Sequence, residues 1–137
     1  MTRGRIDVLL VEDNPGDQLL AKKLFEAANL TVHVTTVDDG EKAMEFVDKW
    51  SSSNRPDLVL LDLNLPKRSG HEVLDYIRGK NLKVPVAVFA GSSSNDDLER
   101  AKQLGAVEYI VKPMGMKEFD ATVPRLRQLA ESLSNAR

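Results

Sequence analysis

A short, fully apolar segment that ends in an aspartate most constrains what this chain can fold into. Residues 58–61 read Leu-Val-Leu-Leu, a pattern typical of a strand that is covered on both faces. Asp62 follows directly, at the carboxyl end of the strand, where open α/β sheets place their binding and catalytic groups. Taken alone, Asp62 could be a solvated loop residue, a helix cap, a metal ligand or a nucleophile.

Four further strand-like segments alternate with helix-like segments along the chain. The predicted strands are 6–11, 31–37, 58–61, 84–90 and 107–111, and the predicted helices are 16–28, 41–50, 69–78, 96–104 and 116–133. Such alternation with short connections predicts an α/β fold, a three-layer sandwich with helices on both faces of a five-stranded parallel sheet. A flavodoxin-like strand order, 2-1-3-4-5, fits best and places a crevice beyond the ends of the first and third strands.

Local signals also predict how four of these helices are built. Ser69 is a candidate cap for the helix that runs to about residue 78, and Asn95 is a candidate cap for the helix 96–104. Pro124 lies inside the last helix, so a kink or break is expected near 120–124. For the first helix, the apolar periodicity predicts an inner face made of Leu19, Leu20, Lys23, Leu24 and Ala27.

Length and composition restrict the functional classes. The 137 residues suit one domain, 1–137, with a core over about 6–133 and no room for an output domain. A net charge of −2 gives no electrostatic case for nucleic acid or an anionic membrane, and without cysteine neither a disulfide nor a thiolate metal site is possible. No signal-peptide core and no apolar run of about 20 residues is found, so a cytoplasmic protein is expected.

Charged residues converge on one edge of the predicted sheet. Glu12 and Asp13 end the first strand, Asp62 ends the third and Lys112 ends the fifth. Two carboxylates about 4 Å apart repel each other by on the order of 4 kcal/mol at an effective dielectric constant near 20. A cation relieves this repulsion, and an all-oxygen ligand set favours Mg²⁺ or Mn²⁺. A metal and an ammonium around one carboxylate suit phosphoryl transfer.

Three motifs carry a family resemblance. The segments Val-Glu-Asp-Asn-Pro-Gly-Asp (11–17), Leu-Asp-Leu-Asn-Leu-Pro-Lys-Arg-Ser-Gly (61–70) and Tyr-Ile-Val-Lys-Pro (109–113) resemble those of a CheY-like response-regulator receiver domain. The chain is most similar to the single-domain type associated with phytochrome-like sensor kinases. The resemblance implies a two-component signalling protein that signals by protein–protein contacts or phosphorelay, and that catalyses only its own phosphorylation and dephosphorylation.

The resemblance also implies a role for each site residue. Asp62 would accept the phosphoryl group from a phosphohistidine and contribute to the metal site. Asp13 would bind Mg²⁺ directly, Glu12 through water, and Asn64 through its backbone carbonyl. Lys112 would pair with the phosphoryl oxygens.

The switch region departs from the family pattern at one position. Tyr109 would be the aromatic residue that moves inward on phosphorylation, and the bond from Lys112 to Pro113 would be cis. The family's hydroxyl residue at the end of the fourth strand falls on Ala90, which cannot bind a phosphoryl oxygen. Ser92 or a backbone N–H group is a possible substitute.

The resemblance further implies partners. These are a sensor histidine kinase, which could be phytochrome-like, and a histidine-phosphotransfer protein. A homodimer is expected through the face formed by the helix 96–104, the strand 107–111 and the last helix. Nucleic acid and membrane are not expected partners.

Three other functions remain open at the level of sequence. Ala90 allows a degenerate receiver that acts as a phosphorylation-independent binding module. An Asp-nucleophile phosphohydrolase would resemble Asp-X-Asp-X-Thr at the nucleophile, whereas residues 62–66 read Asp-Leu-Asn-Leu-Pro. A flavodoxin that binds FMN needs a Ser/Thr-rich loop after the first strand, where residues 12–17 are acidic instead.

Overall fold

The computed structural model describes residues 5–92 and 94–136, with side chains described as far as residue 133. The predicted strand order is confirmed: five parallel strands run in the order β2-β1-β3-β4-β5. The strands are β1 (Ile6–Val11), β2 (Val32–Val37), β3 (Leu58–Leu61), β4 (Val86–Ala90) and β5 (Glu108–Val111). The helices are α1 (Pro15–Ala27), α2 (Gly40–Asp48), α3 (Gly70–Arg78), α4 (Asn95–Gln103) and α5 (Met116–Ala136).

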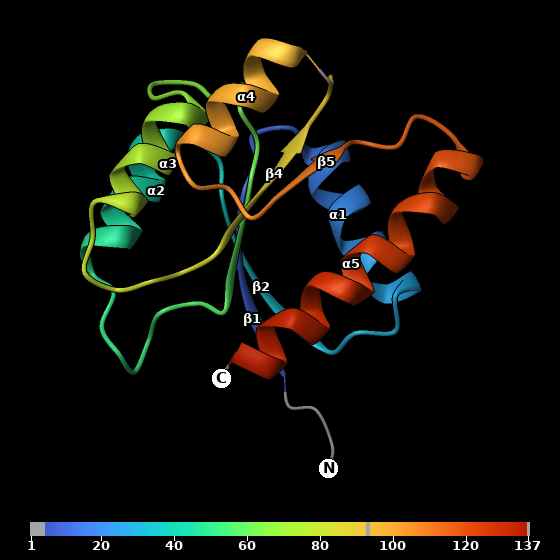
Figure 1. The fold of residues 1–137 in the computed structure, drawn as a ribbon, viewed down its shortest axis with the longest axis horizontal. Helices are drawn as coiled ribbons and strands as arrows, with labels where there is room; N and C mark the ends of the chain where they lie inside the picture. Colours follow the sequence, from blue (N-terminus) through green and yellow to red (C-terminus); the bar gives the residue numbers. More distant parts are fainter. Residues whose placement is uncertain (1–4, 93, 137) are drawn as a thin grey trace.

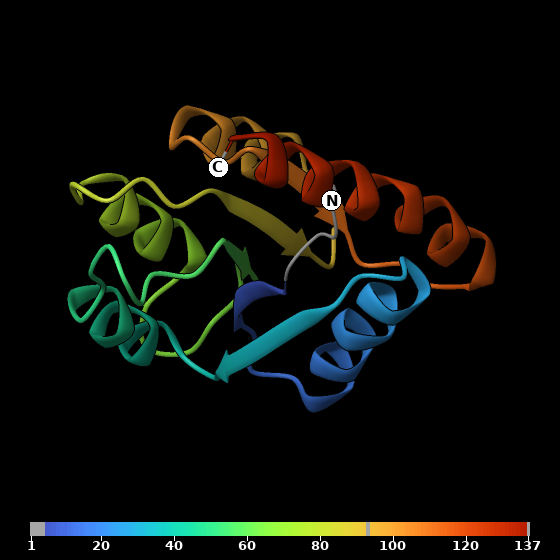
Figure 2. The ribbon, with the colours of Figure 1, turned by 90° about the horizontal axis from the view of Figure 1, so that it is seen from below.

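The helices form two layers, one on each face of the sheet. Figure 1 shows α2, α3 and α4 stacked on one side of the strands, and α1 beside α5 on the other. The view from below in Figure 2 shows the same separation, with the sheet running between the two groups of helices. The three-layer sandwich expected from the sequence is therefore confirmed.

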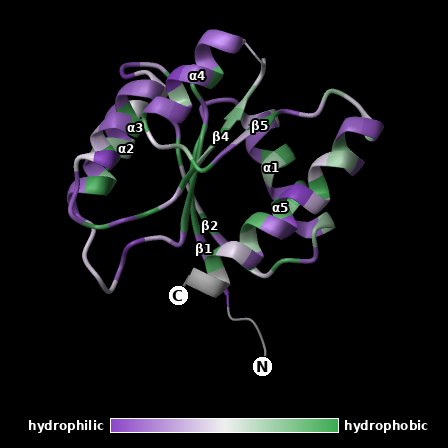
Figure 3. Cartoon of the chain, in the orientation of Figure 1, coloured by the Kyte–Doolittle hydropathy of each residue, from purple (hydrophilic) through white to green (hydrophobic). Residues whose placement is uncertain are grey.

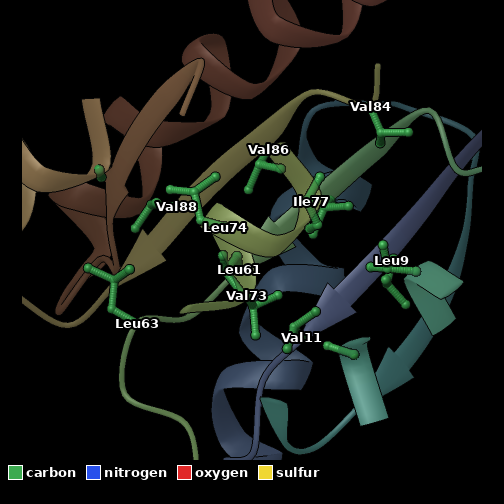
Figure 4. Packing of buried hydrophobic residues seen from close by; sticks show 14 of the residues in the cluster. Leu9, Val11, Leu61, Leu63, Val73, Leu74, Ile77, Val84, Val86 and Val88 are labelled. Carbon is green, nitrogen blue, oxygen red and sulfur yellow. The ribbon is translucent and has the colours of Figure 1, made fainter. Parts of the chain in front are cut away.

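Alternate residues of each central strand feed two separate apolar cores. Leu9, Val59 and Val88 belong to the core beneath α2 and α3, part of which Figure 4 shows at close range. Leu10 and Leu60 belong to the core beneath α1 and α5. The hydropathy colouring in Figure 3 shows this arrangement as hydrophobic strands between helices whose outer faces are hydrophilic. Burial on both faces explains why β1, β3 and β4 are apolar at nearly every position.

The hydrogen-bond ladder continues past the strand ends and aligns the charged residues. The N–H of Glu12 donates to Val37, the N–H of Asp62 donates to Val11, and the N–H of Lys112 donates to Ala90, over 2.7–3.0 Å. These bonds tie the first residue after β1, β3 and β5 to the neighbouring strand. The sheet thereby places three polar side chains along one edge.

Two of the predicted helix details are wrong. α1 buries Ala21, Leu24 and Phe25 and leaves Leu19 and Lys23 exposed, because packing against α5 rotates the helix relative to the face that its leucines suggest. α4 begins one residue earlier than expected, with Ser94 as its cap: the Ser94 hydroxyl accepts from the N–H of Asp97.

The last helix is not broken at its proline. α5 runs continuously through Pro124, where only the bond to the carbonyl of residue 120 is lost. Burial of Leu126 and Ala130 against the sheet holds the helix together beyond this point. No helix within the described ranges combines the length and the apolar character that a membrane span requires.

Candidate acidic site at the strand ends

Three charged side chains at the sheet edge are almost completely buried. Glu12 is 0% exposed, Asp62 5% and Lys112 8%, whereas Asp13 beside them is exposed. Charged groups lose hydration when they are buried, so they persist only when they are paired or bound to a cation. The sequence prediction that these four residues meet is confirmed.

Lys112 stands at the centre of the cluster. Its Nζ atom lies 2.8 Å from Glu12 Oε1 and 3.5 Å from Asp62 Oδ2. It also lies 2.9 Å from Asp17 Oδ2, and 5.6 Å from the centre of the Phe89 ring. One ammonium therefore faces three carboxylates.

The carboxylates fit a hard divalent cation. One oxygen each of Glu12, Asp13 and Asp62 lies within 4.8 Å of the others. Ligands on opposite sides of Mg²⁺ are about 4.2 Å apart, twice the ligand distance of about 2.1 Å, so small side-chain movements would close the site. The donor set is entirely oxygen, which favours Mg²⁺ or Mn²⁺ over softer metals.

Burial also changes the protonation of the site. It raises the pKa of Glu12 to about 7, and the negative charge of Asp62 adds to the rise, while hydrogen bonds from Lys112 and the N–H of Asn14 oppose it. Burial alone would lower the pKa of Lys112, but its bonds to Glu12 and Asp17 outweigh this and raise it. The cluster thus holds more negative charge than one lysine neutralises. A bound cation would reduce the repulsion between these carboxylates.

Two glycines let helix starts approach the loop that follows Asp62. A Cβ atom on Gly70, the first residue of α3, would lie 2.3 Å from the carbonyl oxygen of Asp62. A Cβ atom on Gly40, at the start of α2, would lie 2.3 Å from the carbonyl oxygen of Arg68. The N–H of Gly70 also donates to Leu63 over 2.9 Å. The loop that follows Asp62 is therefore in contact with α3 at its beginning and with α2 near Arg68.

A capping box fixes the start of α3 beside this loop. The Ser69 hydroxyl accepts from the N–H of Glu72, and the Glu72 carboxylate accepts from the N–H of Ser69. The sequence prediction of Ser69 as the cap is confirmed. A rigid α3 start keeps Gly70 in place against Asp62.

Ala90 and Tyr109 occupy the two sides of the loop after β4. Ala90 is buried at the end of β4, one strand away from Lys112, and carries no hydroxyl. The half-buried Tyr109 donates from its hydroxyl to the backbone carbonyl of Ser92 over 3.0 Å. Burial raises the pKa of Tyr109, with a contribution from Asp97, so it stays a neutral donor.

The structure also corrects one expectation and adds a residue. Among the described residues no peptide bond is cis, so the bond from Lys112 to Pro113 is trans, the form that X–Pro bonds favour by about 0.5–1 kcal/mol. Sequence reasoning missed Asp17 as a partner of Lys112. Its position in the first turn of α1, just after the strand-end acids, is the only signal that could have found it.

The fold and the site together define a class. The class is an α/β protein with a doubly wound sheet in this order, whose strand ends carry an acidic cluster that fits a divalent cation and a buried lysine that can pair with an anionic group. Comparison with known families identifies the family. Residues 8–124 match the response regulator receiver domain, and the chain belongs to this family.

Individual relatives and a solved structure support this family assignment. The chain is 37% identical over 125 residues to the probable methanogenesis regulatory protein FilR2 of Methanothrix harundinacea, covering 88% of this chain and 81% of that protein. It is 35% identical over 117 residues to the response regulator Rcp1 of Synechocystis, covering 82% and 80%. The crystal structure of the phosphorylated cyanobacterial phytochrome response regulator RcpA superposes with a TM-score of 0.79 at 31% identity, covering 98% and 97%.

The family membership settles the class of function. The chain is a receiver domain of two-component response regulators, which is neither the flavodoxin nor the phosphohydrolase alternative, and the phosphorylation-independent binding module is not favoured. Rcp1 has been solved in its Mn²⁺-bound form, with a TM-score of 0.76 to this chain at 33% identity, covering 88% of this chain and 91% of Rcp1. In this chain, the carboxylates of Glu12, Asp13 and Asp62 form an acidic cluster whose size and all-oxygen donors fit such an ion.

Proposed function

We propose that Asp62 is the phosphoacceptor of this receiver. The observation that carries the proposal is the position of Asp62, a buried carboxylate at a strand end with the Lys112 ammonium 3.5 Å away and an acidic cluster beside it. An oxygen of Asp62 attacks phosphorus while the bond from phosphorus to the phosphohistidine nitrogen breaks. The phosphoryl group thus moves from the imidazole to the carboxylate.

The neighbouring residues have separate roles in this proposal. Glu12, Asp13, Asp62 and the carbonyl of Asn64 would hold Mg²⁺ or Mn²⁺, which when bound would neutralise charge on the phosphoryl oxygens. Lys112 would pair with a phosphoryl oxygen through its ammonium. The N–H of Asn64, 3.4 Å from Asp62 Oδ1, helps to orient the nucleophile. Burial excludes water and strengthens each of these interactions.

Labelling with acetyl phosphate tests the proposal. With Mg²⁺ present, we expect the intact protein to gain the mass of one phosphoryl group, and Asp62→Asn to gain none. Asp75→Asn, which removes an exposed aspartate of α3, is the matched control and should label like the wild type. Labelling of Asp62→Asn at the wild-type level would show that another residue is the acceptor.

The partner we propose is a sensor histidine kinase, and the similarity to RcpA supports a phytochrome-like one. Onward transfer to a histidine-phosphotransfer protein would make the chain part of a phosphorelay, and we place the exchange in the cytoplasm. Phosphotransfer profiling against the sensor kinases of the source organism identifies the partner. Failure of every kinase to label Asp62 would contradict this proposal.

The dimer we propose uses the surface of α4, β5 and α5. β5 is an edge strand, and Val111 on it and Val107 just before it are 36% and 54% exposed. Arg125 of α5 pairs with Glu108 of β5 at 2.6 Å, so the same surface also offers a charged pair. An apolar edge bordered by charges is suited to contact with a second copy.

A further inference from the structure

Asp17 makes a contact that the proposed roles leave unexplained. Its Oδ2 atom lies 2.9 Å from Lys112 Nζ, whereas Asp62 Oδ2 lies 3.5 Å from the same nitrogen. Lys112 is therefore held more closely by Asp17 and Glu12 than by the proposed phosphoacceptor. The two residues are 95 positions apart in the sequence, so the fold itself creates this pair.

The start of α1 fixes Asp17 in this position. The side chain of Asn14 caps the helix and accepts from the N–H of Asp17 over 2.9 Å. Gln18 donates from Nε2 to the carbonyl of Glu12 over 2.7 Å, which ties the first turn of α1 to the end of β1. The side chain of Asp17 is 33% exposed, whereas Lys112 is buried, so the Asp17 end of this ion pair faces the solvent.

We infer that Asp17 is a positioning residue that holds Lys112 before phosphorylation and competes with the phosphoryl group for it. This inference rests on the proposed role of Asp62. An ammonium has three donor hydrogens, and Glu12 and Asp17 occupy two of them. Until Asp17 releases Lys112, a phosphoryl group on Asp62 can use only the one remaining donor hydrogen, and the charge of Asp17 also repels the incoming anion.

An ordinary structural role for Asp17 predicts something different. Acidic residues in the first turn of a helix interact favourably with the helix dipole whether or not they touch a lysine. In that case, removing the charge would lower the stability of α1 and leave Lys112 unchanged. Competition between Asp17 and the phosphoryl group predicts that removing the Asp17 charge changes the surroundings of the Lys112 ammonium.

The test compares Asp17→Asn with two matched variants. Asp17→Glu keeps the charge, and Asp38→Asn removes one negative charge just after β2, where Asp38 pairs with Lys42 rather than with Lys112. In the metal-free, unphosphorylated protein at one fixed pH, the NMR signal of the Lys112 ε-ammonium should shift in Asp17→Asn and stay in place in Asp38→Asn. Asp17→Glu should restore most of the wild-type signal position.

The second measurement is the rate constant for phosphorylation by acetyl phosphate with Mg²⁺. In this reaction the bond from an Asp62 oxygen to phosphorus forms, the bond from phosphorus to the acetate oxygen breaks, and acetate leaves. We expect Asp17→Asn to react about three- to fivefold faster than the wild type, the range of a partly exposed ion pair. The rate constant of Asp38→Asn should differ less from that of the wild type.

The outcomes separate this inference from the function on which it rests. An unchanged Lys112 ammonium signal in Asp17→Asn, or an unchanged or slower phosphorylation rate, would overturn the inference even if the wild type is labelled on Asp62. A wild type that is never labelled on Asp62 would overturn the proposed function, and the claimed competition with it. Thermal unfolding of each variant shows whether its fold is intact.

Discussion

At the scale of single residues, the site combines burial with an excess of negative charge. Glu12 is the extreme case: it is completely buried, and burial raises its pKa from an ordinary 4.5 to about 7. The folded protein therefore binds a proton on Glu12 in a pH range where the unfolded chain has released it. This difference makes the stability of the metal-free protein depend on pH.

We predict that the metal-free protein loses stability as the pH rises from about 4.5 to about 7. In this window the native state holds the Glu12 proton that the unfolded state lacks, so each rise in pH favours unfolding. The Glu12 contribution is on the order of 3 kcal/mol over the whole window. Urea unfolding in a chelator at several pH values measures it.

Glu12→Gln is the control for this prediction. It removes the titrating group, so its stability should fall less over the same window than that of the wild type. The difference between the two curves isolates Glu12 from the two histidines, which are present in both proteins. Parallel curves would contradict the predicted role of Glu12.

Ala90 leads to a second prediction at the residue scale. We expect Ala90→Thr to increase the structural response to phosphorylation, because the new hydroxyl can bind a phosphoryl oxygen. A charge-assisted hydrogen bond of this kind contributes about 1.5–3 kcal/mol. The measurement is the change in the Tyr109 NMR signals when beryllofluoride, a phosphoryl mimic, is added with Mg²⁺.

Ala90→Val provides the matched control, since valine has the shape of threonine without the hydroxyl. Any effect of filling the buried position at the end of β4 is then common to both variants. Equal changes in the Tyr109 signals in wild type and Ala90→Thr would refute the prediction. A response in Ala90→Val as large as that in Ala90→Thr would attribute the effect to volume.

At the scale of elements, the start of α3 supports the backbone of Asp62 through a contact that leaves no room for a side chain. Gly70 can begin α3 against the Asp62 carbonyl only because it has no Cβ atom. The capping box of Ser69 and Glu72 holds the helix start at that point. Helix geometry and the position of the site are therefore coupled through one glycine.

We predict that Gly70→Ala destabilises the protein and slows phosphorylation of Asp62. Overpacking against rigid backbone costs about 1–3 kcal/mol, more than the gain of about 0.5–1 kcal/mol from replacing glycine within a helix. Urea unfolding and acetyl phosphate labelling measure the two effects.

Gly91→Ala is the matched control for Gly70→Ala. A Cβ atom on Gly91 meets nothing within 4 Å, so this variant should match the wild type in stability. If Gly70→Ala were as stable and as reactive as Gly91→Ala, the contact with Asp62 would have no functional consequence.

At the scale of the whole molecule, the sheet divides the protein into two cores and ends in two edge strands, β2 and β5. The core beneath α1 and α5 and the core beneath α2 and α3 share the same strands. α4 is the least anchored helix, with Ala101 as its only fully buried residue among those described, whereas α3 buries five. The surface of α4, β5 and α5 therefore has the least internal resistance to rearrangement.

We predict that Val111→Asp prevents self-association through this surface. A charge on the exposed side of β5 would be buried without a partner in the proposed dimer, which costs free energy of association. Sedimentation over a range of protein concentrations, with and without beryllofluoride, measures the effect.

The control is Leu19→Asp, which introduces the same charge at an exposed apolar residue of α1, on another face. It should associate like the wild type. A wild type that stays monomeric at every concentration, with and without the mimic, would contradict the proposed dimer.

The sequence by itself determined the alternation of strands and helices, the sheet order and the meeting of Glu12, Asp62 and Lys112. These features follow from local patterns and from one rule: parallel strands bring their carboxyl ends to the same edge. Ser69 could also be predicted as a helix cap, because capping depends on residues three positions apart. Each of these predictions needs only short-range information.

The tertiary structure alone decided the pairing of Asp17 with Lys112, the buried face of α1 and the trans bond before Pro113. The same holds for the contact of Gly70 with Asp62. The Asp17 pairing, the buried face of α1 and the Gly70 contact depend on how a helix is rotated and how closely it packs against the sheet. These are set by contacts between residues far apart in the sequence. Local propensity does not encode those contacts, because the same helix pattern is compatible with several rotations until its neighbours are in place.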